Sequence, residues 1–190
     1  NAALVELHAY LRSLWSSGRL LWQEPSSSLP VELLDVRPGQ RVLDLCAAPG
    51  AKASHLAEKL RGDGCDLGGS LLVANDSNTE RVEDMVLAMQ RLAPSPYTLV
   101  SQCDARSFPL PEASRVPAFD RVLCDVPCSC DGMASKPAAR GFVTHEWSPE
   151  AGLRWHGVQL EIAARARLLV RDGGLLAYST CSLDPLQGEA

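Results

Sequence analysis

The segment Arg41–Ser54, with the sequence RVLDLCAAPGAKAS, constrains the fold of this chain more than any other. Val42–Leu45 is predicted to form a short buried strand, which is followed by a tight turn of small residues and by a helix that starts at Lys52. Small residues let a ligand approach the backbone, and the first turn of a helix offers free N–H groups. We therefore expect the carboxyl end of this strand, with Asp44 and the turn, to bind a nucleotide-like cofactor.

Short apolar runs alternate with helical patterns along the rest of the chain. Predicted strands cover Val42–Leu45, Leu71–Ala74, Tyr97–Val100, Asp120–Cys124 and Leu175–Tyr178, and predicted helices cover Lys52–Leu60, Thr79–Leu92 and Leu153–Val170. The glycine pair after Asp172 is predicted to end the last of these helices. Such alternation is typical of α/β proteins, so we expect a doubly wound, mostly parallel central sheet.

The N-terminal part of the chain has a different pattern. Leucines with helical spacing predict a helix over Ala2–Trp15, the Ser- and Pro-rich residues Gln23–Pro30 predict a loop, and Pro30–Leu34 predicts a short helix. We therefore divide the chain into an N-terminal helical segment, residues 1–38, and a main domain, residues 39–190.

The overall charge and the cysteine content limit the classes of protein to which the chain can belong. A net charge of -5 provides no general attraction to nucleic acid, so a polyanion would need a local basic patch or a part of the protein outside these residues. No apolar run approaches the length of a membrane span, and we expect no membrane partner. The seven cysteines show no disulfide-type spacing, which favours a reducing intracellular compartment: the nucleus or cytosol, with an organelle matrix as the alternative.

Two carboxylates follow later strands of the predicted sheet. Asp76 follows the second strand, where a carboxylate can accept hydrogen bonds from ribose hydroxyls, and Asp104 follows the third, where it could meet an adenine amino group. Asp76 could instead cap the helix that comes after it. The turn Ala47–Ala51 lacks the spaced glycines of a dinucleotide site, which suits a ligand without phosphate. S-adenosylmethionine is the cofactor that we expect.

Two cysteines follow the last two predicted strands. Cys128 lies in the loop after the fourth strand and Cys181 in the loop after the fifth, so the two thiols should face one another if these strands are neighbours. Polar loops are poor places to bury a cysteine for packing alone, which favours a chemical role. A zinc site at Cys124, Cys128 and Cys130 is the alternative, but structural zinc sites use differently spaced pairs, and we predict no metal site.

Four motifs of the chain together resemble those of a known family. They are Leu43–Lys52 (LDLCAAPGAK), Ala74–Asp76 (AND), Cys124–Ser129 (CDVPCS) and Tyr178–Leu183 (YSTCSL). Through them the chain resembles the Sun-type RNA (cytosine-5) methyltransferases, most of all the eukaryotic tRNA-modifying branch. The resemblance implies that residues 39–190 form a Rossmann-like, S-adenosylmethionine-dependent methyltransferase catalytic domain, truncated at its C-terminus. Cys130 departs from the family pattern, in which glycine is usual.

The resemblance also implies roles for individual residues. Cys181 would attack C6 of cytosine as a thiolate, and Cys128 would assist proton removal or product release. Asp125 would hydrogen-bond the edge of the cytosine, and Lys52 would support the same site. The implied cofactor-binding residues lie after the first four strands: Cys46, Ala47, Ala48, Pro49, Gly50, Lys52, Asp76, Arg81, Asp104 and Asp125.

The activity implied by the resemblance is methyl transfer from S-adenosylmethionine to C5 of cytosine in RNA through a covalent Cys–C6 intermediate. tRNA is the expected partner and rRNA the alternative, and an RNA-binding extension is expected outside these acidic residues. The alternative function is a catalytically silent RNA-binding or ribosome-assembly scaffold of the same fold. A scaffold has no chemical need for two thiols together with Asp44, Asp76, Asp104 and Asp125, so we favour the enzyme.

Overall fold

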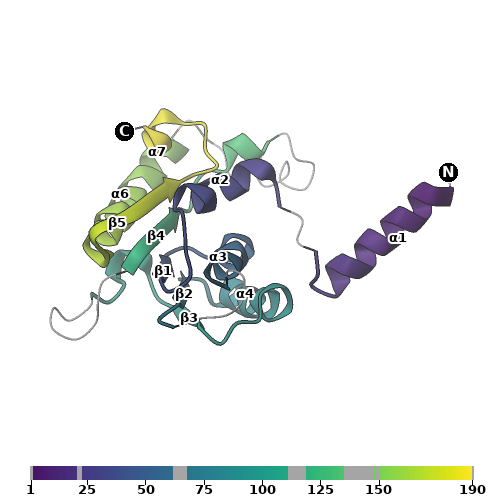
Figure 1. Cartoon of the computed structure of the whole chain (residues 1–190). Helices are drawn as coiled ribbons and strands as arrows, with labels where there is room; N and C mark the ends of the chain where they lie inside the picture. The colour runs from purple at the N-terminus through teal and green to yellow at the C-terminus, as the bar shows by residue number, and fades with distance from the viewer. Residues whose placement is uncertain are drawn as a thin grey trace.

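The computed structural model describes residues 2–20, 23–61, 68–110, 119–134, 148 and 150–189. Its centre is a sheet of five strands: β1 (Arg41–Asp44), β2 (Leu71–Asp76), β3 (Thr98–Gln102), β4 (Phe119–Asp125) and β5 (Val170–Ser179). The strand order is β3-β2-β1-β4-β5, and every pairing is parallel (Figure 1). The predicted α/β fold is confirmed. The strand order reverses at β1, which is where open parallel sheets bind ligands.

Helices cover both faces of the sheet. α3 (Ala51–Arg61) and α4 (Thr79–Leu92) pack in one core, and α6 (Ala151–Leu169) packs in the other. Neighbouring β1 residues enter different cores because successive side chains of a strand point to opposite faces: Val42 packs with α3 and α4, and Leu43 packs with α6. The loops that the structure describes contain the short elements η1 (Ala105–Ser107), η2 (Asp131–Met133) and α7 (Pro185–Gly188).

A helix, α2 (Pro25–Leu33), lies where the sequence predicts a loop over Gln23–Pro30, so that prediction is wrong. Pro25 occupies the first turn of the helix, where its fixed φ favours the helical backbone and its missing N–H costs no hydrogen bond. Val31, on the same helix, is fully buried in the core that contains α3. Tertiary packing therefore outweighs the turn-like composition of this segment.

The start of β5 also differs from the prediction. α6 ends at Leu169 and β5 follows at once, so the glycine pair after Asp172 lies within the strand and does not end the helix. The pairing of β5 with β4 is irregular here. Gly173 has a φ of 75°, and a Cβ on Gly174 would lie 2.8 Å from the carbonyl oxygen of Asp120. The glycines therefore allow the irregular backbone of this strand. From the sequence alone, such a glycine pair cannot be distinguished from one that ends a helix.

The predicted N-terminal helix is confirmed as α1 (Ala2–Ser16), which extends away from the sheet (Figure 1). Its C-terminal end contacts α4, where the guanidinium carbon of Arg91 lies 5.1 Å from the centre of the Trp15 ring. Gly18 has a φ of 73° and lets the chain pass Arg91, because a Cβ at Gly18 would clash with the Arg91 backbone. Among the residues that the structure describes, no helix combines the length and the apolar character needed to cross a membrane.

Candidate active site

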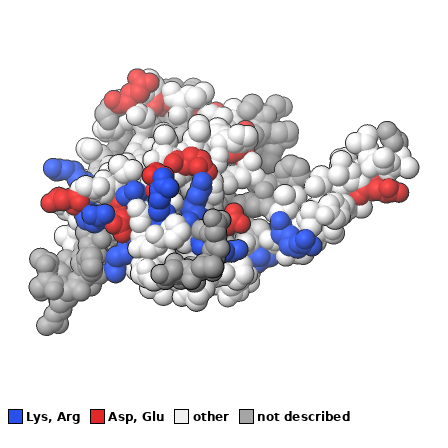
Figure 2. Space-filling view, viewed as in Figure 1, with Lys and Arg blue, Asp and Glu red and all other residues white. Residues whose placement is uncertain are grey.

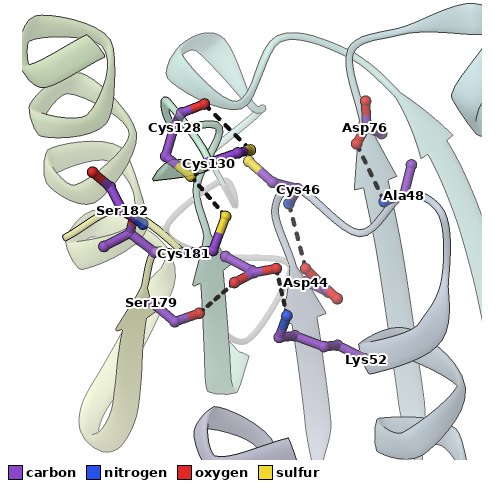
Figure 3. A network of polar contacts seen from close by, with 12 residues as sticks. Asp44, Cys46, Ala48, Lys52, Asp76, Cys128, Cys130, Ser179, Cys181 and Ser182 are labelled. Carbon is purple, nitrogen blue, oxygen red and sulfur yellow. Dashed lines mark hydrogen bonds and ion pairs between the residues drawn. The ribbon is translucent and has the colours of Figure 1, made fainter. Parts of the chain in front are cut away.

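The turn after β1 is positioned by hydrogen bonds to the end of β2. The Ala47 amide donates to the Asn75 carbonyl oxygen at 2.7 Å, and the Ala48 amide donates to Asp76 Oδ2 at 3.2 Å (Figure 3). Gly50 has a φ of 101°, a conformation that glycine adopts readily. The backbone of residues 46–50 is therefore held at the carboxyl end of β1, where the sequence placed a ligand-binding turn.

Asp76 is 4% exposed and accepts hydrogen bonds from two backbone amides, those of Ala48 and Asn78. Arg81 lies beside it, with Nη1 3.7 Å from Asp76 Oδ2, and donates to the Ala48 carbonyl oxygen. The cap of α4 is Asn78, whose Oδ1 accepts from the Arg81 amide at 3.0 Å. Capping, the alternative role for Asp76, therefore belongs to Asn78.

Asp104 lies at the N-terminus of η1. Its Oδ1 accepts from the Arg106 amide at 2.9 Å, and its Oδ2 lies 2.6 Å from Arg106 Nη2. The hydrogen bonds from Arg106 hold the pKa of the Asp104 carboxyl below its ordinary value. The contact of Asp104 with an adenine amino group stays a prediction.

Lys52 reaches from the first turn of α3 to the end of β4. Its Nζ lies 2.7 Å from Asp125 Oδ2, and Ser179 Oγ donates to Asp125 Oδ1 at 2.6 Å (Figure 3). The ion pair is partly shielded from water, since the Lys52 side chain is 17% exposed and that of Asp125 is 32% exposed. Two of the predicted catalytic residues are thus brought into contact at the ends of α3, β4 and β5.

Asp44 is the last residue of β1 and is fully buried. Its Oδ1 accepts from the Cys46 amide at 3.4 Å, whereas its Oδ2 has no hydrogen-bond partner within the part of the chain that the structure describes. Burial, followed by the negative charge of Asp125, raises the pKa of Asp44 to about 8. This carboxyl group is therefore poised to interact with a ligand that carries hydrogen-bond donors or positive charge.

Cys128 and Cys181 face one another at the ends of β4 and β5. Their Sγ atoms are 3.0 Å apart, and Cys130 Sγ lies 3.8 Å from Cys128 Sγ (Figure 3). Hydrogen bonds from Cys130 and Cys181 lower the pKa of the Cys128 thiol. The same hydrogen bonds raise the pKa of Cys130 to about 11 and raise that of Cys181 as well. The first negative charge of the cluster therefore falls on Cys128, which is buried, while Cys181 is exposed.

Comparison with known proteins identifies the family of the chain. Residues 31–190 match the family model described as 16S rRNA methyltransferase RsmB/F. The chain belongs to this family.

Relatives of this RsmB/F-family chain include two curated eukaryotic proteins. The chain is 40% identical over 180 residues to the multisite-specific tRNA:(cytosine-C(5))-methyltransferase of Saccharomyces cerevisiae. The alignment covers 91% of this chain and 26% of the yeast protein. It is 37% identical over 195 residues to the tRNA (cytosine(34)-C(5))-methyltransferase of Drosophila melanogaster. That alignment covers 98% of this chain and 26% of the Drosophila protein. The chain thus spans about a quarter of the length of these relatives.

The crystal structure of NSun6 from Pyrococcus horikoshii with SFG is similar in fold to this chain. The TM-score is 0.77 and the sequence identity 26%, with 93% of this chain and 41% of that chain covered. The similarity extends over nearly the whole chain and therefore includes the sheet edge that carries the site.

In this RsmB/F-family chain, the two cysteine loops are joined by a side chain that the sequence did not single out. Asp131 Oδ1 accepts from Ser129 Oγ and from Ser182 Oγ, each at 2.6 Å. Asp131 Oδ2 accepts from the Leu183 amide at 2.9 Å. Asp131 thereby links the loop after β4 to the loop after β5.

Gln187 of α7 forms a second link and was also missed. It is 2% exposed, its Oε1 accepts from the Ser129 amide at 3.1 Å, and its Nε2 donates to Ser129 Oγ at 2.8 Å. Gln159 of α6 adds a bond from its Nε2 to the Pro127 carbonyl oxygen at 2.8 Å. Because these partners are far apart in the sequence, no local spacing identifies them.

Proposed function

We propose that this chain belongs to the catalytic domain of an S-adenosylmethionine-dependent RNA (cytosine-5) methyltransferase that acts on tRNA. The observation that carries the proposal is the thiol pair Cys128 and Cys181, 3.0 Å apart, on the sheet edge that also carries the Lys52–Asp125 ion pair. Membership of the family and the tRNA (cytosine-C(5)) activity in the names of the two relatives support it. A scaffold gives no reason to hold two reactive thiols together.

The residues at the ends of β1 and β2 fit S-adenosylmethionine. Asp44 Oδ2 is buried without a partner among the described residues, and this cofactor carries both an ammonium and a sulfonium group. We expect the turn of residues 46–50, with Asp76 and Asp104, to bind the ribose and adenine of the cofactor. The solved relative carries SFG, an analogue of this cofactor. When bound, S-adenosylmethionine supplies an electrophilic methyl group.

Two thiols meet the chemical needs of methylation at C5. C5 of cytosine becomes a useful nucleophile only after a thiolate adds to C6. We assign this addition to Cys181, because its side chain is exposed to an incoming base whereas Cys128 is buried. Cys128 carries the negative charge beforehand, so it accepts the Cys181 proton across the 3.0 Å contact as the bond from Cys181 Sγ to C6 forms.

The second half of the reaction needs a base again. After methylation, the proton on C5 must leave and the bond from C6 to Cys181 Sγ must break, which restores the aromatic ring and the Cys181 thiolate. Once its first proton has passed to solvent, Cys128 is the neighbouring group that can accept the C5 proton. Asp125 would meet the N3 edge of the cytosine, and Lys52 would hold the Asp125 carboxylate in place through the 2.7 Å ion pair.

The RNA substrate must present an unstacked base, so we expect a tRNA loop or a flipped cytosine. Basic and acidic side chains are intermixed on the face shown in Figure 2, and the net charge is -5. Phosphates are bound mainly by Lys and Arg, so we propose that a part of the protein outside these residues adds RNA contacts. Reactive thiols also require a reducing compartment, for which we propose the nucleus or cytosol.

Methyl transfer from isotope-labelled S-adenosylmethionine to tRNA by the full-length protein tests the proposal. The parent protein should form 5-methylcytosine, and Cys181→Ala should reduce its formation below detection because the C6 nucleophile is lost. Cys103→Ser is the matched control: Cys103 Sγ bonds Asn75 Oδ1 at 3.3 Å, which a hydroxyl can replace, and activity should be retained. A folded parent protein that binds the cofactor but labels no cytosine would point to a scaffold.

A further inference from the structure

A third thiol joins the catalytic pair. The Sγ atoms of Cys128, Cys130 and Cys181 all lie within 4.8 Å of one another, although they come from two different loops. Cys130 Sγ lies 3.8 Å from Cys128 Sγ and 3.6 Å from the Cys128 carbonyl oxygen. Methylation at C5 uses Cys128 and Cys181 directly, whereas Cys130 is assigned no contact with the reacting base and only hydrogen-bonds Cys128.

The backbone of Cys130 is in an unfavourable conformation for a cysteine. Its φ of 58° and ψ of 17° lie in the left-handed region, which disfavours side chains with a Cβ and suits glycine. A cysteine at this position therefore needs a compensating role, and its thiol lies beside the two others. Cys124, the third ligand in the zinc site that the sequence argued against, is fully buried in the core with α6, and Cys181 takes its place.

We propose that Cys128, Cys130 and Cys181 bind a thiophilic cation, of which Zn²⁺ is the commonest, with a fourth coordination position open to solvent. Tetrahedral zinc has Zn–S bonds of about 2.3 Å, which place its sulfur atoms about 3.8 Å apart. The pair Cys128 and Cys130 already has this separation, at 3.8 Å. The pair Cys128 and Cys181, at 3.0 Å, must open slightly, and Cys181 is the exposed member that can move.

Binding of the cation would regulate the proposed reaction. Each ligand that starts as a thiol releases its proton to solvent on binding, so the cation competes with protons as well as with substrate. A bound cation would occupy the Sγ lone pair of Cys181 that must attack C6, and the enzyme would be silent until the cation is removed. This consequence rests on the proposed function, whereas binding of the cation does not.

Titration of the reduced, metal-free full-length protein with Co²⁺ tests the site, because thiolate ligation of Co²⁺ produces a charge-transfer band in the near ultraviolet. We expect a band that saturates and is displaced by Zn²⁺. Cys130→Gly suits the local backbone, so it should keep the fold and weaken Co²⁺ binding at least about tenfold. Cys130→Ser, which keeps the side-chain volume, should do the same, and Cys103→Ser should bind like the parent.

Three outcomes would overturn the proposal. They are the absence of a thiolate band in the reduced parent, a Co²⁺ affinity in either folded Cys130 variant equal to that of the parent, and a loss of Co²⁺ affinity in Cys103→Ser equal to that in the Cys130 variants. Zn²⁺ inhibition of methyl transfer, measured in parallel, should be relieved by a chelator and be at least about tenfold weaker in Cys130→Gly. A Co²⁺ band that depends on Cys130, in a metal-free protein that never methylates RNA, would support the cation site while it contradicts the proposed function.

Discussion

The two sides of the site are built in different ways. On the cofactor side, the turn of residues 46–50 is positioned by its own backbone amides, which bond the end of the adjacent strand β2. On the thiol side, Cys128 and Cys181 are 53 residues apart in sequence, and their loops are joined by the side chains of Asp131 and Gln187. The backbone amides of one turn thus set the first side, and hydrogen bonds between two distant loops, most of them made by side chains, set the second.

This difference implies that the two sides can be damaged separately. A substitution that parts the two loops should impair the chemical step and spare cofactor binding. A substitution at the end of β2 should do the reverse. Asp44 lies at the end of β1, beside the charge of Asp125. Its protonation can be detected from how the free energy of unfolding depends on pH, without an activity assay.

Gly132→Ala should have the largest effect. The Gly132 amide donates to the Cys181 carbonyl oxygen at 3.0 Å, and a Cβ at Gly132 would lie 2.5 Å from the same oxygen, so the loops must separate. We expect kcat to fall about 100-fold, the cost of misplacing a reacting group by roughly 1 Å. The dissociation constant of S-adenosylmethionine, measured by calorimetry, should be unchanged.

Gly157→Ala is the matched control for this substitution. Gly157 lies on α6, and a Cβ there would meet nothing within 4 Å, so both kcat and cofactor affinity should be retained. Equal loss of cofactor affinity and kcat in Gly132→Ala would contradict the separation of the two sides.

Asp44→Asn should change how stability depends on pH. The pKa of Asp44 is about 8 in the folded protein against 3.8 ordinarily, so between these values the folded state keeps a proton that the unfolded state has lost. Asp44 therefore destabilises the protein as pH rises, by about 1.4 kcal/mol per pH unit. In urea unfolding, the free energy of unfolding of the variant should rise by about 2 kcal/mol relative to that of the parent as the pH is raised from about 5.5 to about 7. A difference that is constant with pH would show that Asp44 is ionised throughout.

Asp76→Asn should have the smallest of these effects and act on the cofactor side. Asparagine removes the charge but retains one oxygen for the Ala48 amide, so we expect S-adenosylmethionine binding to weaken about tenfold. Calorimetric titration measures the affinity. Alkylation of Cys181 should proceed at the parental rate, and a changed rate would mean that the two sides are coupled.

Local patterns predicted the elements that are local in the structure. The unit from β1 to α3 could be predicted because one continuous segment contains the buried strand, the small-residue turn and the helix start. The facing of Cys128 and Cys181 followed from two strand ends and the assumption that β4 and β5 are neighbours, which the strand order confirms. The fold and the positions of Cys128 and Cys181 could therefore be predicted from the sequence.

The remaining features depend on contacts between distant segments. α2 has a turn-like composition and is a helix because Val31 packs in the core. The irregular start of β5, where Gly173 has a positive φ, resembles a helix end when only the sequence is considered. Asp131 and Gln187 link loops that are far apart in the sequence, so no local periodicity predicts these contacts. The approach of Cys130 to the thiol pair likewise depends on how its loop folds.

Trapping of a protein–RNA adduct by full-length Cys128→Ala tests the central claim, that the two thiols divide the work, most directly. Loss of Cys128 also removes the hydrogen bond that raises the pKa of Cys181, so Cys181 can still add to C6, but the adduct lacks the base needed to break down. Our account predicts a slowly migrating band on a denaturing gel that requires RNA and S-adenosylmethionine and is lost in Cys128→Ala combined with Cys181→Ala. Absence of the band in folded Cys128→Ala, or its persistence in the double variant, would contradict these roles.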